Sequence, residues 1–261
     1  ALQTITTPTS AQIYQRGLAL YHTGDYTAAY ADFISATQLI SSPMAGQVYQ
    51  RGLAAYRLQD YPAAFKDFDA AIQAGRETTS ALIYRGLAAY HMQRYAQANA
   101  DFSAVLKADA TQTKLYRERG LARYHLNQTA LAQRDFEIAV RVDPRDAGAW
   151  FYLGLLQRDA GQLADALASF NRALTLRPTD QAALYARGRL QYQRGDFVSA
   201  QADLNDVVKR DPKNAGAHYY LGVMLYKGGA FDQALNNLDQ AIALEPTRAY
   251  AYYYRALTQR K

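Results

Sequence analysis

The stretch YQRGLAAY (residues 49–56) returns with small changes as YQRGLALY (residues 14–21) and YRGLAAY (residues 84–90). Its apolar positions recur at intervals of three and four residues, which is typical of one face of an amphipathic helix. A glycine stands in the middle of this pattern, and an arginine stands directly before the glycine. Both residue types are unusual on an apolar helix face, so each needs a physical reason.

Copies of this stretch follow one another with a nearly fixed period. The glycines are 35 residues apart once and then 34 residues apart five times. An alanine follows each glycine after twelve residues, and a phenylalanine or leucine follows after sixteen. Turn sequences such as Gly24-Asp25 separate the first helix of a repeat from a second, and a proline closes each of the last four repeats. Each repeat is therefore predicted to be a pair of helices. The repeat glycines are Gly17, Gly52, Gly86, Gly120, Gly154, Gly188 and Gly222.

The clearest repeat is WFYLGLLQRDAGQLADALASFNRALTLRP (residues 150–178). Its diagnostic residues are Trp150, Leu153, Gly154, Ala166, Phe170, Ala173 and Pro178. This pattern resembles the tetratricopeptide repeat (TPR) family over about residues 10–261, as seven full repeats and the first helix of an eighth. The resemblance implies an all-α fold, a right-handed alpha-alpha superhelix (TPR solenoid) of antiparallel helix pairs.

The repeats also predict the domain organisation. Residues 1–9 carry no helical period and are expected to be a flexible lead. Residues 10–261 are expected to be a single TPR array. Its repeats are predicted at about residues 10–44, 45–78, 79–112, 113–146, 147–180, 181–214 and 215–248, with a half-repeat at 249–261.

The arginine before the glycine varies together with an aspartate fifteen residues after the glycine. Five repeats have both residues, whereas repeats five and seven have leucine at the first position and serine or asparagine at the second. A half-buried guanidinium at a helix contact is costly unless it meets a carboxylate. We therefore predict structural ion pairs, under 4 Å long by the ordinary definition of a salt bridge, that join the two helices of a repeat. The predicted pairs are Arg16–Asp32, Arg51–Asp67, Arg85–Asp101, Arg119–Asp135 and Arg187–Asp203.

The TPR resemblance implies that the first helices line a concave face on which ligands bind. Three positions of each first helix share this face, at three residues before, one after and four after the glycine, and aromatic or aliphatic side chains dominate them. Tyrosine offers contact area and a hydroxyl group, so we interpret this stripe as a partner-binding groove. The alternative is that these rings pack only between neighbouring first helices. The predicted groove residues are Tyr14, Tyr21, Tyr49, Tyr56, Tyr90, Arg117, Tyr124, Phe151, Arg158, Tyr185, Arg189, Tyr192, Tyr219 and Tyr226.

Three of these positions are arginines, Arg117, Arg158 and Arg189, all in repeats four to six, with Lys114 and Arg123 nearby. The excess of basic over acidic side chains also lies in the later part of the chain. Residues 1–113 hold 8 basic and 8 acidic side chains, whereas residues 114–261 hold 21 and 15. This patch predicts a partner segment with a carboxylate or a phosphorylated side chain. The alternative is an ordinary solvated basic surface.

Catalytic motifs are missing from the sequence. The chain has no cysteine, no phosphate-binding glycine loop and no nucleophile elbow or zinc-protease motif. His22, His91 and His125 occupy equivalent places in repeats one, three and four. Equivalent residues of adjacent repeats are expected about 8–10 Å apart, too far to share a metal. We therefore predict no enzyme, no cofactor and no metal. The neutral first part argues against nucleic acid as the partner.

The longest apolar runs are far shorter than the ~18 residues of a membrane span, which predicts a soluble protein, cytoplasmic by default. Export to the periplasm after processing is the alternative, because the chain opens at Ala1.

The predicted function is a non-catalytic adaptor or assembly scaffold that holds an extended or helical segment of another protein in the groove. One alternative is a homo-oligomeric scaffold that uses its ends, because the last helix is rich in tyrosine and lacks a mate. The other is the non-catalytic TPR region of a larger enzyme.

Overall fold

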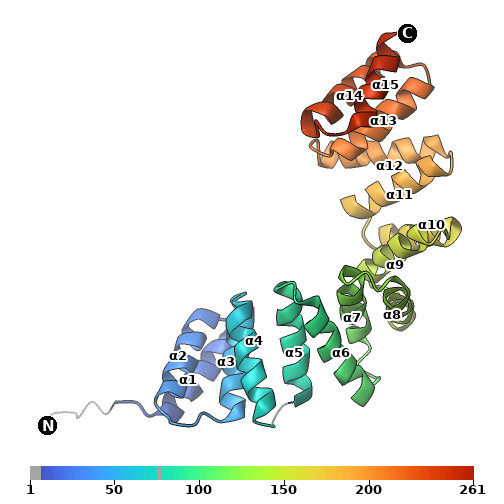
Figure 1. Ribbon diagram of the computed structural model, residues 1–261. Coiled ribbons are helices and arrows are strands. Elements are labelled where there is room, and N and C mark those ends of the chain that lie inside the picture. The colour runs from blue at the N-terminus through green and yellow to red at the C-terminus, as the bar shows by residue number, and fades with distance from the viewer. Residues whose placement is uncertain (1–6, 76–77) are drawn as a thin grey trace. The chain divides into compact units, whose positions relative to one another are not determined.

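Fifteen α-helices and no strand make up the described part of the chain, residues 7–75 and 78–261 of the computed structural model (Figure 1). The all-α prediction is confirmed, and the helices fit seven pairs followed by one further first helix. The first helices are α1 (Ser10–Thr23), α3 (Ala45–Arg57), α5 (Thr78–His91), α7 (Lys114–His125), α9 (Ala147–Asp159), α11 (Gln181–Gln193), α13 (Ala215–Lys227) and α15 (Ala249–Gln259). The second helices are α2 (Tyr26–Gln38), α4 (Tyr61–Gln73), α6 (Tyr95–Ala108), α8 (Thr129–Val142), α10 (Leu163–Leu176), α12 (Phe197–Arg210) and α14 (Phe231–Leu244).

A short turn joins the two helices of each repeat. In the first repeat Gly24 takes a left-handed conformation with φ of 89°, and Asp25 then caps α2 by accepting a hydrogen bond from the N–H of Ala28. In the second repeat the same left-handed position is held by Gln59, with φ of 63°. A non-glycine residue is less stable in this region, so the turn is imposed there by the packing of the two helices.

The repeat glycines lie where the two helices of a pair approach most closely. A Cβ atom on Gly154 would lie 2.7 Å from the ring of Phe170, and one on Gly86 would lie 2.7 Å from the ring of Phe102. These distances are shorter than a van der Waals contact, so glycine makes the space that the ring fills. The residues sixteen positions after each glycine are fully buried. They are Phe33, Phe68, Phe102, Phe136, Phe170, Leu204 and Leu238.

The helices belong to two compact halves, the N-terminal half (residues 1–138) and the C-terminal half (residues 139–261). Within the N-terminal half, α2 packs on α3, α4 on α5 and α6 on α7, and within the C-terminal half α10 packs on α11, α12 on α13 and α14 on α15. First helices also contact each other, α1 with α3 and α3 with α5 in one half, and α9, α11, α13 and α15 in sequence in the other. Each half therefore has a face built from first helices.

Parts of the predicted domain organisation lie outside the described residues. These are residues 1–6 of the flexible lead and residues 76–77 near the end of the second repeat. The helix α1 begins at Ser10, where the hydroxyl of Thr9 accepts a hydrogen bond from the N–H of Gln12. The single array over residues 10–261 and its repeat limits stay predictions. In residues 7–75 and 78–261, no helix combines the length and the apolar character of a membrane span.

Candidate functional site

In five repeats the arginine before the glycine binds the aspartate on the second helix of its own repeat. The arginine Nη2 lies 2.6–2.7 Å from Oδ1 and its Nε lies 2.7–3.0 Å from Oδ2, so each contact is bidentate. The aspartate side chains are at most 10% exposed. A buried carboxylate needs hydrogen-bond donors, and in each pair the arginine supplies two of them. The pairs are Arg16–Asp32, Arg51–Asp67, Arg85–Asp101, Arg119–Asp135 and Arg187–Asp203.

The same arginines also reach the preceding repeat, which the sequence analysis missed. Nη1 of Arg187 donates to Oδ1 of Asn171 at 2.8 Å, and Nη1 of Arg85 forms an ion pair with Asp69. Both acceptors lie seventeen residues after the glycine of the preceding repeat. One guanidinium therefore joins three helices, and it sets both the pairing within a repeat and the stacking between repeats.

Three members of the predicted basic patch lie in the N-terminal half, and two of them, Arg117 and Arg123, make contacts within the protein. Nη1 of Arg123 lies 2.7 Å from Oδ2 of Asp135, and its Nε donates to Asn99. Burial lowers the pKa of Arg123 below its ordinary value. Arg117 lies 2.6 Å from the carboxylate of Glu118. Arg123 is thus half-buried, and it shares Oδ2 of Asp135 with Nε of Arg119.

The predicted groove aromatics lie on the first helices with part of each ring packed inside the protein. Tyr14 lies 5.5 Å from Phe33 between ring centroids, and Tyr192 lies 5.6 Å from Phe197, the first residue of its second helix. Tyr49 is buried. These rings therefore help to join the two helices of a repeat and also keep an exposed portion. The half-buried members are Tyr14, Tyr21, Tyr56, Tyr90, Tyr124, Phe151, Tyr185, Tyr192, Tyr219 and Tyr226.

A further set of tyrosines, which the sequence analysis did not select, links the rings of adjacent repeats. Tyr220 lies 6.4 Å from Tyr185 and 5.1 Å from Tyr192 of the preceding repeat, and Tyr84 lies 5.6 Å from Tyr56. Both stand two residues before the repeat glycine. The sequence feature that could have identified these tyrosines is weak, because only some repeats have an aromatic residue at this position. Burial is the main cause that raises the pKa of Tyr56 to about 12.

A nitrogen-bearing side chain at the end of several first helices lies against the preceding repeat. His125 stacks on Tyr95 with 4.4 Å between centroids, and its Nε2 lies 3.2 Å from the hydroxyl of Tyr90. Lys227 makes the equivalent contacts, with Nζ 3.3 Å from the Tyr192 hydroxyl and 5.2 Å from the ring centroid of Phe197. These side chains thus contribute to repeat stacking. The four members of this set are Arg57, His91, His125 and Lys227.

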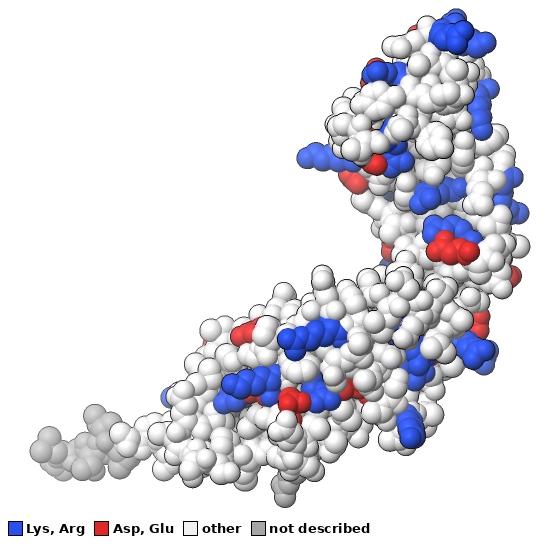
Figure 2. Space-filling model, in the orientation of Figure 1, with Lys and Arg blue, Asp and Glu red and all other residues white. Residues whose placement is uncertain are grey.

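The C-terminal half contains a cavity of about 280 Å³ on its first-helix face, here named the Arg158–Arg189 pocket. It is lined by Arg158, Arg189, Tyr192, Gln193 and Tyr220, which come from α9, α11 and α13. It brings together three predicted groove residues from repeats five and six with the unpredicted Tyr220 of repeat seven. Figure 2 shows lysine and arginine side chains spread over the visible face of this half. The pocket combines positive charge with aromatic walls.

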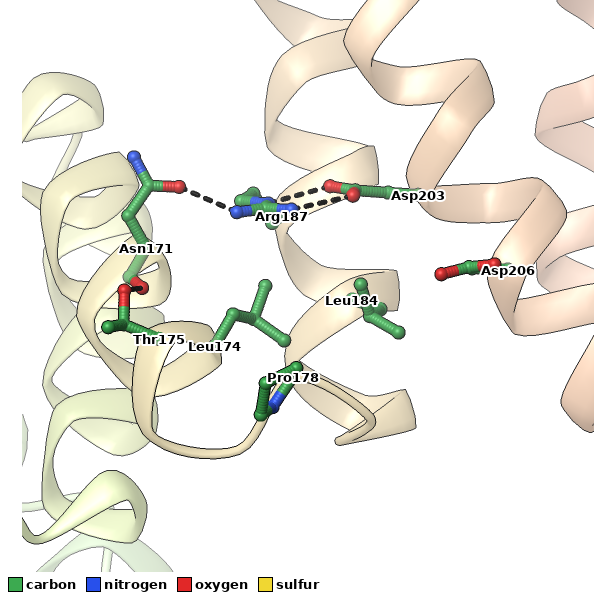
Figure 3. A pocket seen from close by; sticks show the side chains of 8 residues that line it. All are labelled: Asn171, Leu174, Thr175, Pro178, Leu184, Arg187, Asp203 and Asp206. Carbon is green, nitrogen blue, oxygen red and sulfur yellow. Dashed lines mark hydrogen bonds and ion pairs between the residues drawn. The ribbon is translucent and has the colours of Figure 1, made fainter.

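A second cavity, of about 380 Å³, lies around Arg187 between α10, α11 and α12. Figure 3 shows the Arg187 guanidinium between Asn171 and Asp203, above the apolar side chains of Leu174 and Leu184. Two of its three charged groups, Arg187 and Asp203, are already engaged in the Arg187–Asp203 pair. We therefore regard this cavity as part of the contact between repeats.

Within the residues that the structure describes, no three His, Asp or Glu side chains are grouped as metal ligands would be. The architecture is that of a helical-repeat protein with stacked helix pairs and a partly exposed aromatic face.

Comparison with known proteins identifies the family. The tetratricopeptide repeat profile matches residues 49–113, 117–181 and 185–235. The chain belongs to the tetratricopeptide repeat family. A search of curated protein sequences finds no significant match.

Solved structures of this fold align over most of the chain. The C-terminal part of a TPR protein from Cytophaga hutchinsonii has a TM-score of 0.71 at 19% identity and covers 92% of this chain and 98% of its own. A TPR protein from Parabacteroides merdae has a TM-score of 0.65 at 17% identity and covers 96% and 98%. YrrB, described as a TPR protein with an unusual peptide-binding site, has a TM-score of 0.63 at 24% identity and covers 72% and 97%. At these identities the likeness concerns the fold.

Proposed function

We propose that this chain is a non-catalytic adaptor or assembly scaffold that holds an extended or helical segment of another protein on its first-helix face. The observation that carries this proposal is the row of half-buried tyrosines along the first helices of each half. Fully buried Phe and Leu side chains already fill the space between the two helices of a repeat. The exposed portions of the tyrosines therefore remain available for contact with a partner, with hydroxyl groups that donate and accept hydrogen bonds.

The partner segment is proposed to be acidic or phosphorylated. The predicted groove arginines support this, because Arg158 and Arg189 lie together in one pocket and the C-terminal half is rich in basic side chains. Arg117 is proposed as a separate basic position of the N-terminal half. YrrB, which has the same fold, is described as having a peptide-binding site, and this favours a peptide segment as the partner.

Self-association is a second candidate function, and exposed tyrosines on α15 favour it. Tyr250 is 68% exposed and Tyr253 is 57% exposed. Large exposed aromatic side chains mark contact surfaces. Sedimentation velocity over a range of protein concentrations tests this candidate, which predicts a concentration-dependent dimer or larger species that Tyr250→Ser removes. A monomer at every concentration would contradict it.

The experiment for the adaptor proposal selects peptides from a displayed random library on the immobilised chain and measures their dissociation constants by fluorescence anisotropy. Tyr56→Leu and Tyr192→Leu, one in each half, remove groove rings but keep apolar packing volume. Tyr30→Leu is the matched control, because Tyr30 is also half-buried but lies on the second helix α2. We expect at least one groove variant to weaken binding and Tyr30→Leu to leave it unchanged. Selected peptides that bind all three variants equally would contradict the proposal.

A further inference from the structure

Arg189, inside the Arg158–Arg189 pocket, has an unusual environment for a half-buried arginine. Its guanidinium carbon lies 5.5 Å from the ring centroid of Tyr185 and 5.7 Å from that of Tyr220. Its Nε atom is buried, and among the described residues it has no hydrogen-bond partner. A buried N–H without an acceptor is unfavourable, so this arginine is held by aromatic contacts with part of its bonding capacity unused.

Arg187 lies on the same helix, α11, but has a different environment. Arg187, two residues earlier, makes two hydrogen bonds to Asp203 and one to Asn171. Arg189 makes no ion pair with any described residue, so it differs from Arg187, which pairs with Asp203. The difference follows from position, because Arg187 faces its own second helix whereas Arg189 faces the pocket. Arg189 is therefore not explained by the structural pairs.

Arg158, the second arginine of the pocket, has only a weak internal partner. Its Nε and Nη2 atoms both donate to Oδ1 of Asp159, at 2.9 Å and 2.8 Å. Asp159 is the next residue along the chain and its side chain is 52% exposed. An exposed ion pair of this kind contributes little and exchanges readily with solvent or another anion. Arg158 can therefore turn to a ligand at small cost.

We propose that the Arg158–Arg189 pocket binds the carboxylate of a glutamate or aspartate side chain on the partner segment. This inference rests on the proposed adaptor function and specifies its acidic contact. Arg158, Arg189 and Asp159 together carry a net charge of about +1, which one carboxylate neutralises. The rings of Tyr192 and Tyr220 accept the methylene groups of such a side chain, and guanidinium groups bind carboxylates through paired N–H donors.

A phosphorylated side chain fits the pocket less well. At neutral pH a phosphate monoester carries close to two negative charges, and it needs more donors than a carboxylate. Arg158, Arg189 and Asp159 together carry a net charge of about +1, so the second negative charge of a phosphate has no counterpart in the pocket. The observations therefore favour the singly charged group.

The test uses the whole isotope-labelled chain and small blocked amino acids as probes. The probes are N-acetylglutamate α-amide, the matching glutamine compound and the matching phosphoserine compound. Arginine Nε–H signals are followed by NMR, and Arg189→Lys identifies the Arg189 signal by its loss. We expect the glutamate probe to shift this signal saturably, with at least about tenfold weaker binding of the glutamine probe, as loss of a charge-assisted hydrogen bond implies. Equal shifts from glutamate and glutamine, or tighter binding of phosphoserine, would overturn the proposal.

Substitutions assign the effect to the pocket. R189Q and R158Q should each weaken binding of the glutamate probe about tenfold or more. R172Q is the control, because Arg172 is exposed on the second helix α10 and its loss changes net charge by the same amount. R189K keeps the positive charge but lacks the planar guanidinium group with its paired N–H donors. This variant should bind the glutamate probe more weakly than the unchanged chain. If R172Q weakens binding as much as R189Q, the attraction is general charge and the proposed site is wrong.

The two proposals can fail separately. Selected peptides that lack an acidic residue, and that bind R189Q as well as the unchanged chain, would overturn the carboxylate pocket and leave the adaptor proposal standing. A saturable response to the glutamate probe, together with no selected peptide at all, would support the pocket and contradict the adaptor proposal.

Discussion

Arg187 and Asp203 are joined by two hydrogen bonds of 2.7 Å, from Nε to Oδ2 and from Nη2 to Oδ1. The Asp203 side chain is 8% exposed and the Arg187 side chain 22% exposed. The pair connects α11 with α12, and its third contact reaches Asn171 on α10 (Figure 3). A buried carboxylate with such a partner is strongly destabilising when the partner is removed.

The first prediction concerns this pair. Arg187→Leu alone should lower the free energy of unfolding by about 3 kcal/mol, because it leaves the buried carboxylate without its donor. The double variant Arg187→Leu with Asp203→Ser should lose much less, because Leu153 and Ser169 occupy these positions naturally in the fifth repeat. Urea unfolding followed by circular dichroism measures both. A double variant that is no more stable than the single one would contradict the predicted coupling.

The second prediction concerns the repeat glycine. Gly154→Ala should destabilise the chain by about 1–3 kcal/mol, because the added Cβ would lie 2.7 Å from the ring of Phe170. Gly46→Ala is the matched control, since Gly46 lies in α3 with no atom within 4 Å of such a Cβ. Alanine there should be neutral or stabilise by up to about 1 kcal/mol. Thermal unfolding distinguishes the two, and equal losses would argue against the close helix approach.

The third prediction concerns alkaline pH. Burial is the main cause that raises the pKa of Tyr56 to about 12 and that of Tyr219 to about 12. The ordinary pKa of tyrosine is about 10, so the folded state favours the neutral phenol. Their contribution to stability should be complete below about pH 10 and should be lost as the pH rises from about 10 to 12.

Absorbance at the tyrosinate band, recorded against pH, measures this titration. Tyr56→Phe and Tyr219→Phe should each remove a late-titrating tyrosine from the curve of the folded chain. A titration in which the Tyr56 and Tyr219 variants match the unchanged chain would contradict the assignment.

The fourth prediction concerns the nitrogen-bearing side chains between repeats. His91 stacks on Tyr61 with 4.2 Å between centroids. His91→Ala should lower stability by about 0.5–1.5 kcal/mol through loss of this stack. His91→Arg should restore most of it, because Arg57 lies over Tyr26 at the equivalent place in the preceding repeat. Urea unfolding of both variants provides the measurement, and an arginine variant as unstable as the alanine variant would show that the stack is incidental.

Much of the fold could be predicted because its determinants lie within one repeat. The close approach of Gly154 and Phe170 depends on residues only sixteen apart, and the same spacing recurs along the chain. The pairing of Arg187 with Asp203 could be inferred for the same reason, since the two residues are present or absent together.

Features that depend on how neighbouring helices meet, and not on a recurring residue type, were harder to predict. The contact of Arg187 with Asn171 involves a position whose residue type changes from repeat to repeat. Tyr220 lines the Arg158–Arg189 pocket, although its position in the repeat is not one of the three predicted groove positions. Arg123 was assigned to the surface patch because its approach to Asp135 depends on how α7 and α8 meet. The left-handed turn position at Gln59 could not be recognised in the sequence, because the residue there is not glycine.

The central claim is that the first helices hold the partner segment. Hydrogen–deuterium exchange on the chain, with and without a selected peptide, tests it most directly. We predict that bound peptide slows exchange in first helices, such as α9, α11 and α13 if the peptide occupies the C-terminal half, and leaves the second helices α10, α12 and α14 unchanged. Protection confined to the second helices would contradict the claim.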